Sequence, residues 1–284
     1  MCRFIAYRGP AIRLHELLLK PKNSLIHQSI HASEAEETLN GDGFGLGWYD
    51  EAIDNTPGLF VSTQPAWSDQ NLVRLAPKLR SHCFFAHVRA ASQGVISRQN
   101  CHPFIYQTMQ MMHNGTVVGF PKIKRQIQQT LSDPIFDWLQ GSTDSEHVFA
   151  LMLDYLHRHQ LPHQGINIRY AMEYAVKTVR HLQQQAGIEG PTQLNLVVSN
   201  GDEIIASRLC YGAQGVPHTL YYAVGDHVWT EQGVCHLSAP HGEGHAVLLS
   251  SEKLDDHMAD WQLVPAQHGL LIDNQSRVQM FAWQ

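Results

Sequence analysis

The chain has 284 residues, of which 43% are apolar and 16% are charged, and its formal net charge is −6. This composition is typical of a folded globular protein with a sizeable core, organised as one large domain or two ordinary ones. The negative charge argues against a nucleic acid as partner. No segment approaches the roughly 18 continuous apolar residues of a membrane span. No apolar region of a secretory signal follows the first residues.

The cysteines and histidines indicate the compartment and argue against a metal. Five cysteines, an odd number without Cys-x-x-Cys spacing, favour free thiols in a reducing cytoplasm over a disulfide framework. The histidine-rich segment 157–163 suggests a metal site, but no His-Glu-x-x-His pattern or Cys/His quartet accompanies it. We therefore predict a solvated helix end there, and neither a metal nor another cofactor.

Cys2 follows the initiating methionine directly. Aminopeptidases generally remove Met before a residue as small as cysteine, and removal of Met1 would leave one residue that carries both a thiol and a free α-amine. Such a residue holds a nucleophile together with its own base, because the two pKa values lie close together. A cysteine can also stand at position 2 by chance, and Cys2 alone favours that interpretation.

The first part of the chain predicts a strand, a short helix and a glycine-rich turn. The apolar run 2–8 predicts a strand that begins at the cysteine, followed by a helical turn at 14–20 and a polar loop at 24–37. Segment 40–49 has alternating glycines but no Gly-Lys-Ser/Thr sequence. It predicts a turn entering a strand where another backbone or a ligand approaches closely, and not a nucleotide site.

The remaining elements fall into strands and two blocks of helices. Strands are predicted at 59–62, 83–89, 107–112, 193–199, 203–207, 219–224, 245–250, 269–273 and 277–281. Helices are predicted at 68–80, 121–131, 144–159 and 166–186. This pattern predicts an α+β protein with stacked sheets flanked by helices, and a single domain over residues 1–284 because no repeat or linker interrupts it.

Several polar residues stand at positions that permit two interpretations. Arg89 closes an apolar strand and is compatible with an ordinary rim residue. Asn114 and Gly115 are a hairpin signal, but an amide side chain and a backbone N–H at one place can also form an oxyanion hole. Asp144 lies in a helix-capping sequence, where an acidic residue in the first turn is expected without any function.

Taken in order, these segments resemble the class II glutamine amidotransferases, the N-terminal-nucleophile amidohydrolases, and most of all their stand-alone YafJ, EgtC and Dug3 group. The resemblance spans nearly the whole chain and rests on the motifs Met-Cys-Arg-Phe-Ile-Ala-Tyr (1–7), Asp-Gly-Phe-Gly-Leu-Gly-Trp-Tyr (42–49), His-Val-Arg-Ala-Ala-Ser (87–92), Asn-Cys-His-Pro-Phe (100–104), His-Asn-Gly (113–115), Thr-Asp-Ser-Glu (143–146), Ser-Ser-Glu-Lys-Leu (250–254) and Trp-Gln-Leu-Val-Pro (261–265).

The resemblance implies a fold and a role for each matching residue. The fold would be the four-layer α-β-β-α sandwich of two antiparallel sheets flanked by helices. Cys2 would be the nucleophile and its amine the base, with the oxyanion hole formed by Asn114 and Gly115. The substrate's α-carboxylate would bind Arg89, and its α-ammonium would bind Asp144.

Two further matches and one departure complete the comparison with the family. Ser92 and His102 also match and would have supporting roles. Ala90 stands where the synthases of this class have a bulky aromatic residue, which places the chain in the stand-alone group.

The resemblance leaves three functions open. The chain would hydrolyse a γ-glutamyl amide, either glutamine or a conjugate, and release the amine to solvent. Alternatively, it would supply ammonia to a separate synthase, or it would be a catalytically silent binding protein. The length is that of one amidohydrolase domain without a synthase, which favours hydrolysis. The substrate is expected to be a small γ-glutamyl compound, with no nucleic-acid or membrane partner. Loops 21–43 and 209–217 would border the pocket for the leaving amine, but their residue types do not specify one amine. The sequence does not specify the oligomeric state either.

Overall fold

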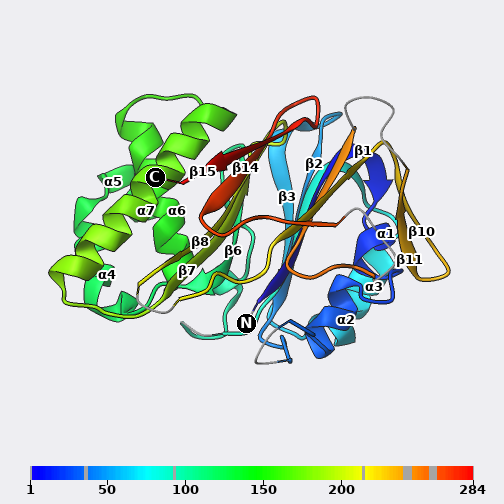
Figure 1. The fold of residues 1–284 in the computed structure, drawn as a ribbon, viewed down its shortest axis with the longest axis horizontal. Helices are drawn as coiled ribbons and strands as arrows, with labels where there is room; N and C mark the ends of the chain where they lie inside the picture. Colours follow the sequence, from blue (N-terminus) through cyan, green and yellow to red (C-terminus); the bar gives the residue numbers. More distant parts are fainter. Residues whose placement is uncertain are drawn as a thin grey trace.

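Two antiparallel β-sheets packed face to face form the centre of the structure, and a layer of helices covers the outer face of each sheet (Figure 1). The structure is a computed structural model and describes residues 2–34, 38–91, 94–212, 215–238, 245–255 and 261–283. The expected α+β fold, a four-layer α-β-β-α sandwich, is confirmed.

The first sheet contains the N-terminal strand at its centre. Its strands are β1 (Arg3–Arg13), β2 (Phe44–Asp50), β3 (Asp54–Ser62), β4 (Arg80–Val88), β9 (Tyr221–Gly225), β12 (Ala246–Ser250) and β13 (Gln262–Leu263). Their order across the sheet is β13-β9-β12-β1-β4-β2-β3. β1 therefore has a strand on each side, and it pairs with β4 from Arg3 opposite Val88 onward.

The second sheet is built from the middle and the end of the chain. Its strands are β5 (Phe104–Tyr106), β6 (Met109–Thr116), β7 (Thr192–Ser199), β8 (Ile204–Tyr211), β14 (His268–Ile272) and β15 (Val278–Ala282). Their order is β15-β14-β8-β7-β6-β5. A separate hairpin joins β10 (Val228–Glu231) to β11 (Val234–Leu237).

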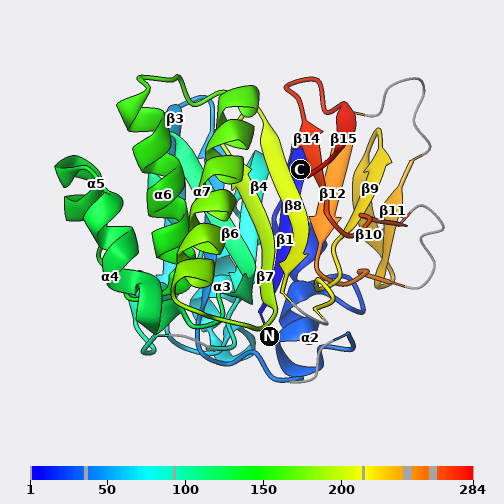
Figure 2. The ribbon, with the colours of Figure 1, turned by 60° about the vertical axis from the view of Figure 1, so that its left-hand side comes forward.

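The helices lie in two groups, one on each side of the sandwich (Figure 2). Beside the first sheet lie α1 (His15–Leu18), α2 (Leu25–Ile30) and α3 (Gln70–Leu75). Beside the second sheet lie α4 (Phe120–Thr130), α5 (Asp133–Trp138), α6 (Asp144–Arg158) and α7 (Gly165–Gln185). Short 3₁₀ helices occur at Ala66–Ser68 and Arg98–Asn100.

Each interface between layers has its own apolar core. In β1, Ile5 and Tyr7 pack toward α1–α3, whereas Phe4 and Ala6 pack into the core between the sheets. Both faces of this strand are therefore buried, which explains why its sequence is an almost continuous apolar run. A third core fills the space between the second sheet and α4–α7.

Glycines allow the two sheets to approach closely near β2. A Cβ atom at Gly45 would lie 2.2 Å from the carbonyl oxygen of His102, and one at Gly47 would lie 2.0 Å from Oε1 of Gln110. Both contacts are shorter than any real Cβ contact. The expectation that the alternating glycines mark a strand approached by another backbone is therefore confirmed.

Two local predictions were wrong. Segment 24–29, expected as a loop, forms α2, because the side chain of Ser24 accepts a hydrogen bond from the backbone N–H of His27 and caps the helix. The helix expected at 68–80 is limited to α3, since Asp69 caps its start and Pro77 follows its end. Helix α5 and the β10–β11 hairpin were not predicted from the sequence.

Truncation of a side chain between the sheets is expected to destabilise the fold strongly. Phe85 on β4 is fully buried in that core. Phe85→Ala should lower the free energy of unfolding by about 3–5 kcal/mol, since it removes apolar contact and leaves a cavity. Urea unfolding monitored by circular dichroism measures this. The control is Ile53→Ala in the exposed β2–β3 turn, where the change should be about 0.5 kcal/mol or less. Equal effects of the two substitutions would contradict the prediction.

Candidate active site

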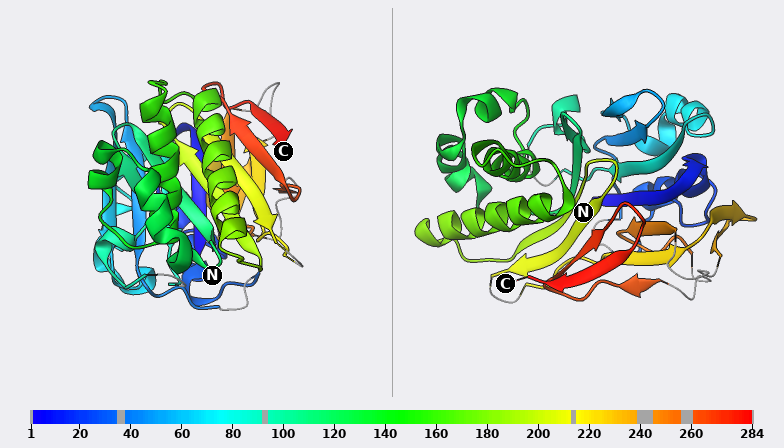
Figure 3. Two further views of the ribbon diagram at one scale, coloured as in Figure 1. Left: turned by 90° about the vertical axis from the view of Figure 1, so that its left-hand side faces the viewer. Right: turned by 90° about the horizontal axis from the view of Figure 1, so that it is seen from above.

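The N-terminal end of β1 brings Cys2 next to residues that follow β4. Because β1 and β4 are antiparallel and pair from Arg3 opposite Val88, the residue before Arg3 lies beside those after Val88. The thiol of Cys2 lies 3.4 Å from the carbonyl oxygen of Ala90, a contact between residues 88 positions apart. Figure 3 shows the N-terminus at one end of the sandwich, between the two sheets.

The thiol of Cys2 is partly buried, and this affects its acidity. Burial raises the pKa of the Cys2 thiol, while the hydrogen bond to Ala90 and the positive charges of Arg89 and Arg3 act in the opposite direction. The net pKa lies above the usual range, so the thiol is protonated at neutral pH. A nucleophilic role would therefore require a base that removes this proton.

Arg89 is buried beside the glycine-rich segment. Its backbone N–H donates to the carbonyl of Gly43 at 2.8 Å, and its carbonyl accepts from the backbone N–H of Asp42 at 2.9 Å. Its side chain donates to the carbonyl of Val95 at 3.3 Å. Its positive charge acts to lower the pKa of both Cys2 and Cys101.

Asn114 and Gly115 lie near the end of β6, in the second sheet. A bond between Nε2 of His87 and the carbonyl of His113, 3.3 Å long, connects the end of β4 to the residue before Asn114. The Asn114 side chain is fully buried, and neither its nitrogen nor its oxygen has a partner among the described residues. An unsatisfied buried amide costs about 1–3 kcal/mol and calls for an explanation, of which a bound ligand is one.

Gly115 cannot carry a side chain in this strand pairing. A Cβ atom there would lie 2.0 Å from the carbonyl oxygen of Gln193 on β7 and 2.6 Å from Nε2 of His113. The close approach of β7 therefore explains the glycine without reference to chemistry.

Asp144 is the first residue of α6 and is buried near the exit of β6. Its carboxylate accepts a hydrogen bond from the backbone N–H of Val117 at 2.7 Å and another from that of Ser145 at 2.9 Å. The helix cap is Thr143, whose hydroxyl accepts from the N–H of Glu146. Asp144 thus connects the start of α6 to Val117, which follows β6 and lies three residues after Asn114.

His102 belongs to a group of buried histidines at the centre of the sandwich. Its Nδ1 lies 2.8 Å from Nε2 of His87, and His113 contacts the hydroxyl of Ser145 at 2.8 Å. Burial lowers the pKa of His87 to about 3 and that of His102 well below its ordinary value. His102 therefore reaches the candidate site through His87 and His113, while Ser92, the other expected supporting residue, lies outside the described residues.

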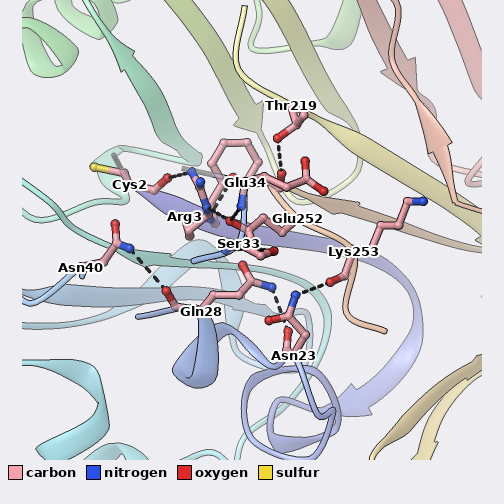
Figure 4. Close-up of polar contacts among 12 residues, drawn as sticks. Cys2, Arg3, Asn23, Gln28, Ser33, Glu34, Asn40, Thr219, Glu252 and Lys253 are labelled. Carbon is pink, nitrogen blue, oxygen red and sulfur yellow. Dashed lines mark hydrogen bonds and ion pairs between the residues drawn. The ribbon is translucent and has the colours of Figure 1, made fainter. Parts of the chain in front are cut away.

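An ion pair beside Cys2 was not among the predicted features of the site. Arg3 is almost fully buried and contacts Glu252 at 2.6 Å, and it also donates to the Cys2 carbonyl at 2.8 Å (Figure 4). The arginine inside the apolar run 2–8 was the available signal, because such a residue is seldom buried unless it is paired. Burial and then the charge of Arg3 lower the pKa of His218 to about 4.

The described residues contain neither a metal cluster nor a membrane-spanning helix. Among them, no three histidine, cysteine, aspartate or glutamate side chains are grouped so as to hold a metal ion. None of their helices combines the length and the apolar character needed to cross a bilayer.

The sequence is similar to known enzymes along most of its length. Residues 22–273 match the family model of class II glutamine amidotransferases. The probable glutamine amidotransferase DUG3 of Saccharomyces cerevisiae is 34% identical over 295 aligned positions, covering 97% of this chain and 83% of that protein. The gamma-glutamyl-hercynylcysteine sulfoxide hydrolase of Mycolicibacterium smegmatis is 34% identical over 270 positions, covering 94% of each chain.

A solved structure has a similar fold. The glutamine aminotransferase class-II domain protein from Silicibacter pomeroyi superposes with a TM-score of 0.67 and 25% sequence identity, covering 99% of each chain.

Acidification is expected to destabilise the protein, because buried histidines stay neutral in the folded state. The folded pKa is about 3 for His87 and about 4 for His147 and His218, whereas histidines of the unfolded chain titrate near pH 6.5. Between these values the unfolded chain binds more protons, so stability is greatest above about pH 6.5 and falls as the pH falls toward 4. Each such histidine contributes up to about 1.4 kcal/mol per pH unit.

Urea titrations at about pH 5, 6 and 7 measure the free energy of unfolding. Potentiometry provides an independent check, since unfolding near pH 5.5 should take up more than one proton per molecule. Equal stability at pH 5 and pH 7, without proton uptake, would contradict the prediction.

Proposed function

The chain belongs to the class II glutamine amidotransferases, and we propose that it hydrolyses the γ-amide of glutamine or of a γ-glutamyl compound through a thioester at Cys2. The observation that carries this proposal is the placement of the Cys2 thiol, 3.4 Å from the carbonyl of Ala90, the residue that follows Arg89. The proposal treats residues 1–284 as one amidotransferase unit in the cytoplasm, where the five free cysteines remain reduced.

Removal of Met1 would activate the nucleophile. The α-amine of Cys2, then free, takes the proton of its own thiol, whose raised pKa makes such a base necessary. The thiolate attacks the γ-carbonyl carbon of the substrate. The carbonyl oxygen becomes an oxyanion, which accepts hydrogen bonds from the Asn114 side-chain amide and the Gly115 backbone N–H. The amide of Asn114, buried and without a partner in the described part of the chain, supports this role.

The thioester forms and is then hydrolysed. The tetrahedral intermediate collapses, the C–N bond breaks, and the leaving amine takes the proton from the α-ammonium of Cys2. Water then attacks the thioester with the α-amine again as base, and the acid product leaves as the thiol is restored.

Two charged residues would orient the substrate. The glutamyl end of the substrate is a zwitterion, and the guanidinium of Arg89 would bind its α-carboxylate while Asp144 would bind its α-ammonium. Holding this end places the γ-amide against the thiol, which converts the attack into an effectively unimolecular step. Ser92 and His102 would have supporting roles, His102 through its contact with His87.

The names of the relatives support two versions of the reaction. The M. smegmatis protein is named as a γ-glutamyl hydrolase, which supports hydrolysis of a conjugate with release of the amine. The S. cerevisiae protein is named as a probable glutamine amidotransferase, which supports a glutaminase that supplies ammonia to a partner synthase. A catalytically silent binding protein is the third alternative.

The state of the N-terminus and a substrate panel test the reaction. Mass spectrometry should find the purified chain without Met1, and the isolated chain should release glutamate from glutamine, glutathione or another γ-glutamyl amide. Cys2→Ala should reduce this turnover by at least about 10³-fold, because replacement of a catalytic nucleophile typically has an effect of this order or larger. A retained Met1 would contradict the mechanism. Absence of turnover without a partner protein would instead favour the ammonia-supplying subunit.

Asn114→Ala tests the oxyanion hole. Loss of one donor should lower kcat by about 10²–10³-fold with a smaller change in KM, because the hydrogen bond forms mainly in the transition state. The matched control is Asn55→Ala, an exposed asparagine on β3 at the opposite end of the sandwich, for which kcat should be unchanged. A kcat of Asn114→Ala within threefold of the parent would exclude this role.

A further inference from the structure

The segment that follows β12 places one buried carboxylate next to the N-terminal residues. Ser251 continues the pairing with β1: its backbone N–H donates to the carbonyl of Phe4, and its hydroxyl accepts from the N–H of Phe4. On its other side the segment is held by Asn23, whose side chain donates to the carbonyl of Lys253. The backbone therefore fixes Glu252 beside Arg3 (Figure 4).

Arg3 connects this carboxylate to Cys2. Its Nε donates to Oε1 of Glu252 at 2.6 Å, and its Nη1 donates to the carbonyl oxygen of Cys2 at 2.8 Å. Both charged side chains are 1% exposed. A guanidinium group is planar and rigid, so the carboxylate that holds Nε also fixes the direction in which Nη1 donates.

The hydrogen bond to the carbonyl of Cys2 matters for the orientation of this residue, because Cys2 precedes the strand and is not held by strand pairing. Pairing of β1 with β4 starts at Arg3, and that with β12 starts at Ile5. The contacts found for Cys2 are the thiol contact with Ala90 and the hydrogen bond to its carbonyl. The peptide plane between Cys2 and Arg3 sets the directions in which the amine and the thiol project. Its orientation is therefore part of the catalytic geometry.

The same carboxylate also holds the loop that leads to the glycine-rich segment. Oε2 of Glu252 accepts from the backbone N–H of Ser33 at 3.0 Å and from its hydroxyl at 2.8 Å, and Oε1 accepts from the N–H of Glu34 at 3.0 Å. Burial acts to raise the pKa of Glu252, but Arg3 and these donors outweigh burial and lower it. The carboxylate is thus ionised at neutral pH.

We propose that Glu252 is a positioning residue for the reaction of Cys2, acting through the side chain of Arg3. This inference rests on the proposed function for its kinetic consequence. Glu252 does not touch the substrate. It fixes the Cys2 peptide plane through Arg3 and, with the bonds from Ser33 and Glu34, the loop beside the nucleophile. Separate substitutions therefore test the contact with Arg3 and the contacts with the loop.

The test compares Glu252→Gln with a matched control in the helical layer. Asp154 is 1% exposed and has the same kinds of partner, namely Nε of Arg158 at 2.6 Å and the backbone N–H and hydroxyl of Ser132, each at 2.7 Å. It lies about 15 Å along α6 from Asp144. Both Glu252→Gln and Asp154→Asn should lower the melting temperature. Glu252→Gln should lower kcat at least tenfold, while Asp154→Asn should leave kcat within twofold of the parent.

Two further variants distinguish the contact with Arg3 from the contacts with the loop. Arg3→Lys keeps the cation and the loop contacts but cannot reach both acceptors, so it should lower kcat at least tenfold with little change in KM. Ser33→Ala removes one loop contact and should raise KM severalfold while kcat stays within twofold. Arg3→Lys decides the question if Glu252→Gln fails to fold.

The alkylation of Cys2 by iodoacetamide provides a readout that does not depend on turnover. Its pH profile should shift to lower pH in Glu252→Gln, because the charge of Arg3 is then no longer compensated. If the parent chain hydrolyses no γ-glutamyl compound, the proposed function fails, yet this profile still tests the positioning role. An unchanged profile, or a kcat within twofold of the parent for both Glu252→Gln and Arg3→Lys, would overturn the inference.

Discussion

The antiparallel pairing of β1 between β4 and β12 is the constraint on which the candidate site depends. It places the N-terminal strand inside the sheet and fixes its first residues against the ends of its neighbours. Cys2 consequently lies beside Ala90, although 88 positions separate them. A short chain end is usually poorly ordered unless it is tied into a sheet. Here the pairing on both sides begins within a few residues of Cys2.

The second requirement is that the two sheets approach closely at this end of the sandwich. Glycines on β2 leave room for His102 and Gln110 from the other sheet, and the bond from His87 to the His113 carbonyl connects β4 to β6. Asn114 follows directly. The buried histidines are neutral, and the buried Asn114 side chain has no hydrogen-bond partner among the described residues, so this region is buried and polar. Hydrogen bonds to a developing charge are stronger in such an environment than in water.

Secondary structure that follows from a regular sequence pattern was predicted well. Contacts between residues far apart in the sequence were not predicted. The strand β1, the long helix α7 and the capping sequence at the start of α6 were predicted from apolar patterning and local hydrogen bonding. Helix α2 was missed because its cap at Ser24 lies in a polar sequence typical of loops. The end of α3 was misplaced although Pro77 gave the signal. Arg3 and Glu252 both lie in family motifs, but their contact was not predicted because it joins residues 249 positions apart.

The sequence by itself determined the family motifs, the alternation of strands and helices, and the residue types that the chemistry requires. These depend on local pattern, which one chain carries in full. Only the tertiary structure decided that the Asn114 amide is buried without a partner among the described residues, and that Gly115 has no room for a side chain against β7. It also decided that the Glu252 carboxylate binds both Arg3 and Ser33. These facts depend on how two sheets pack, and packing is a property of pairs of residues remote in sequence.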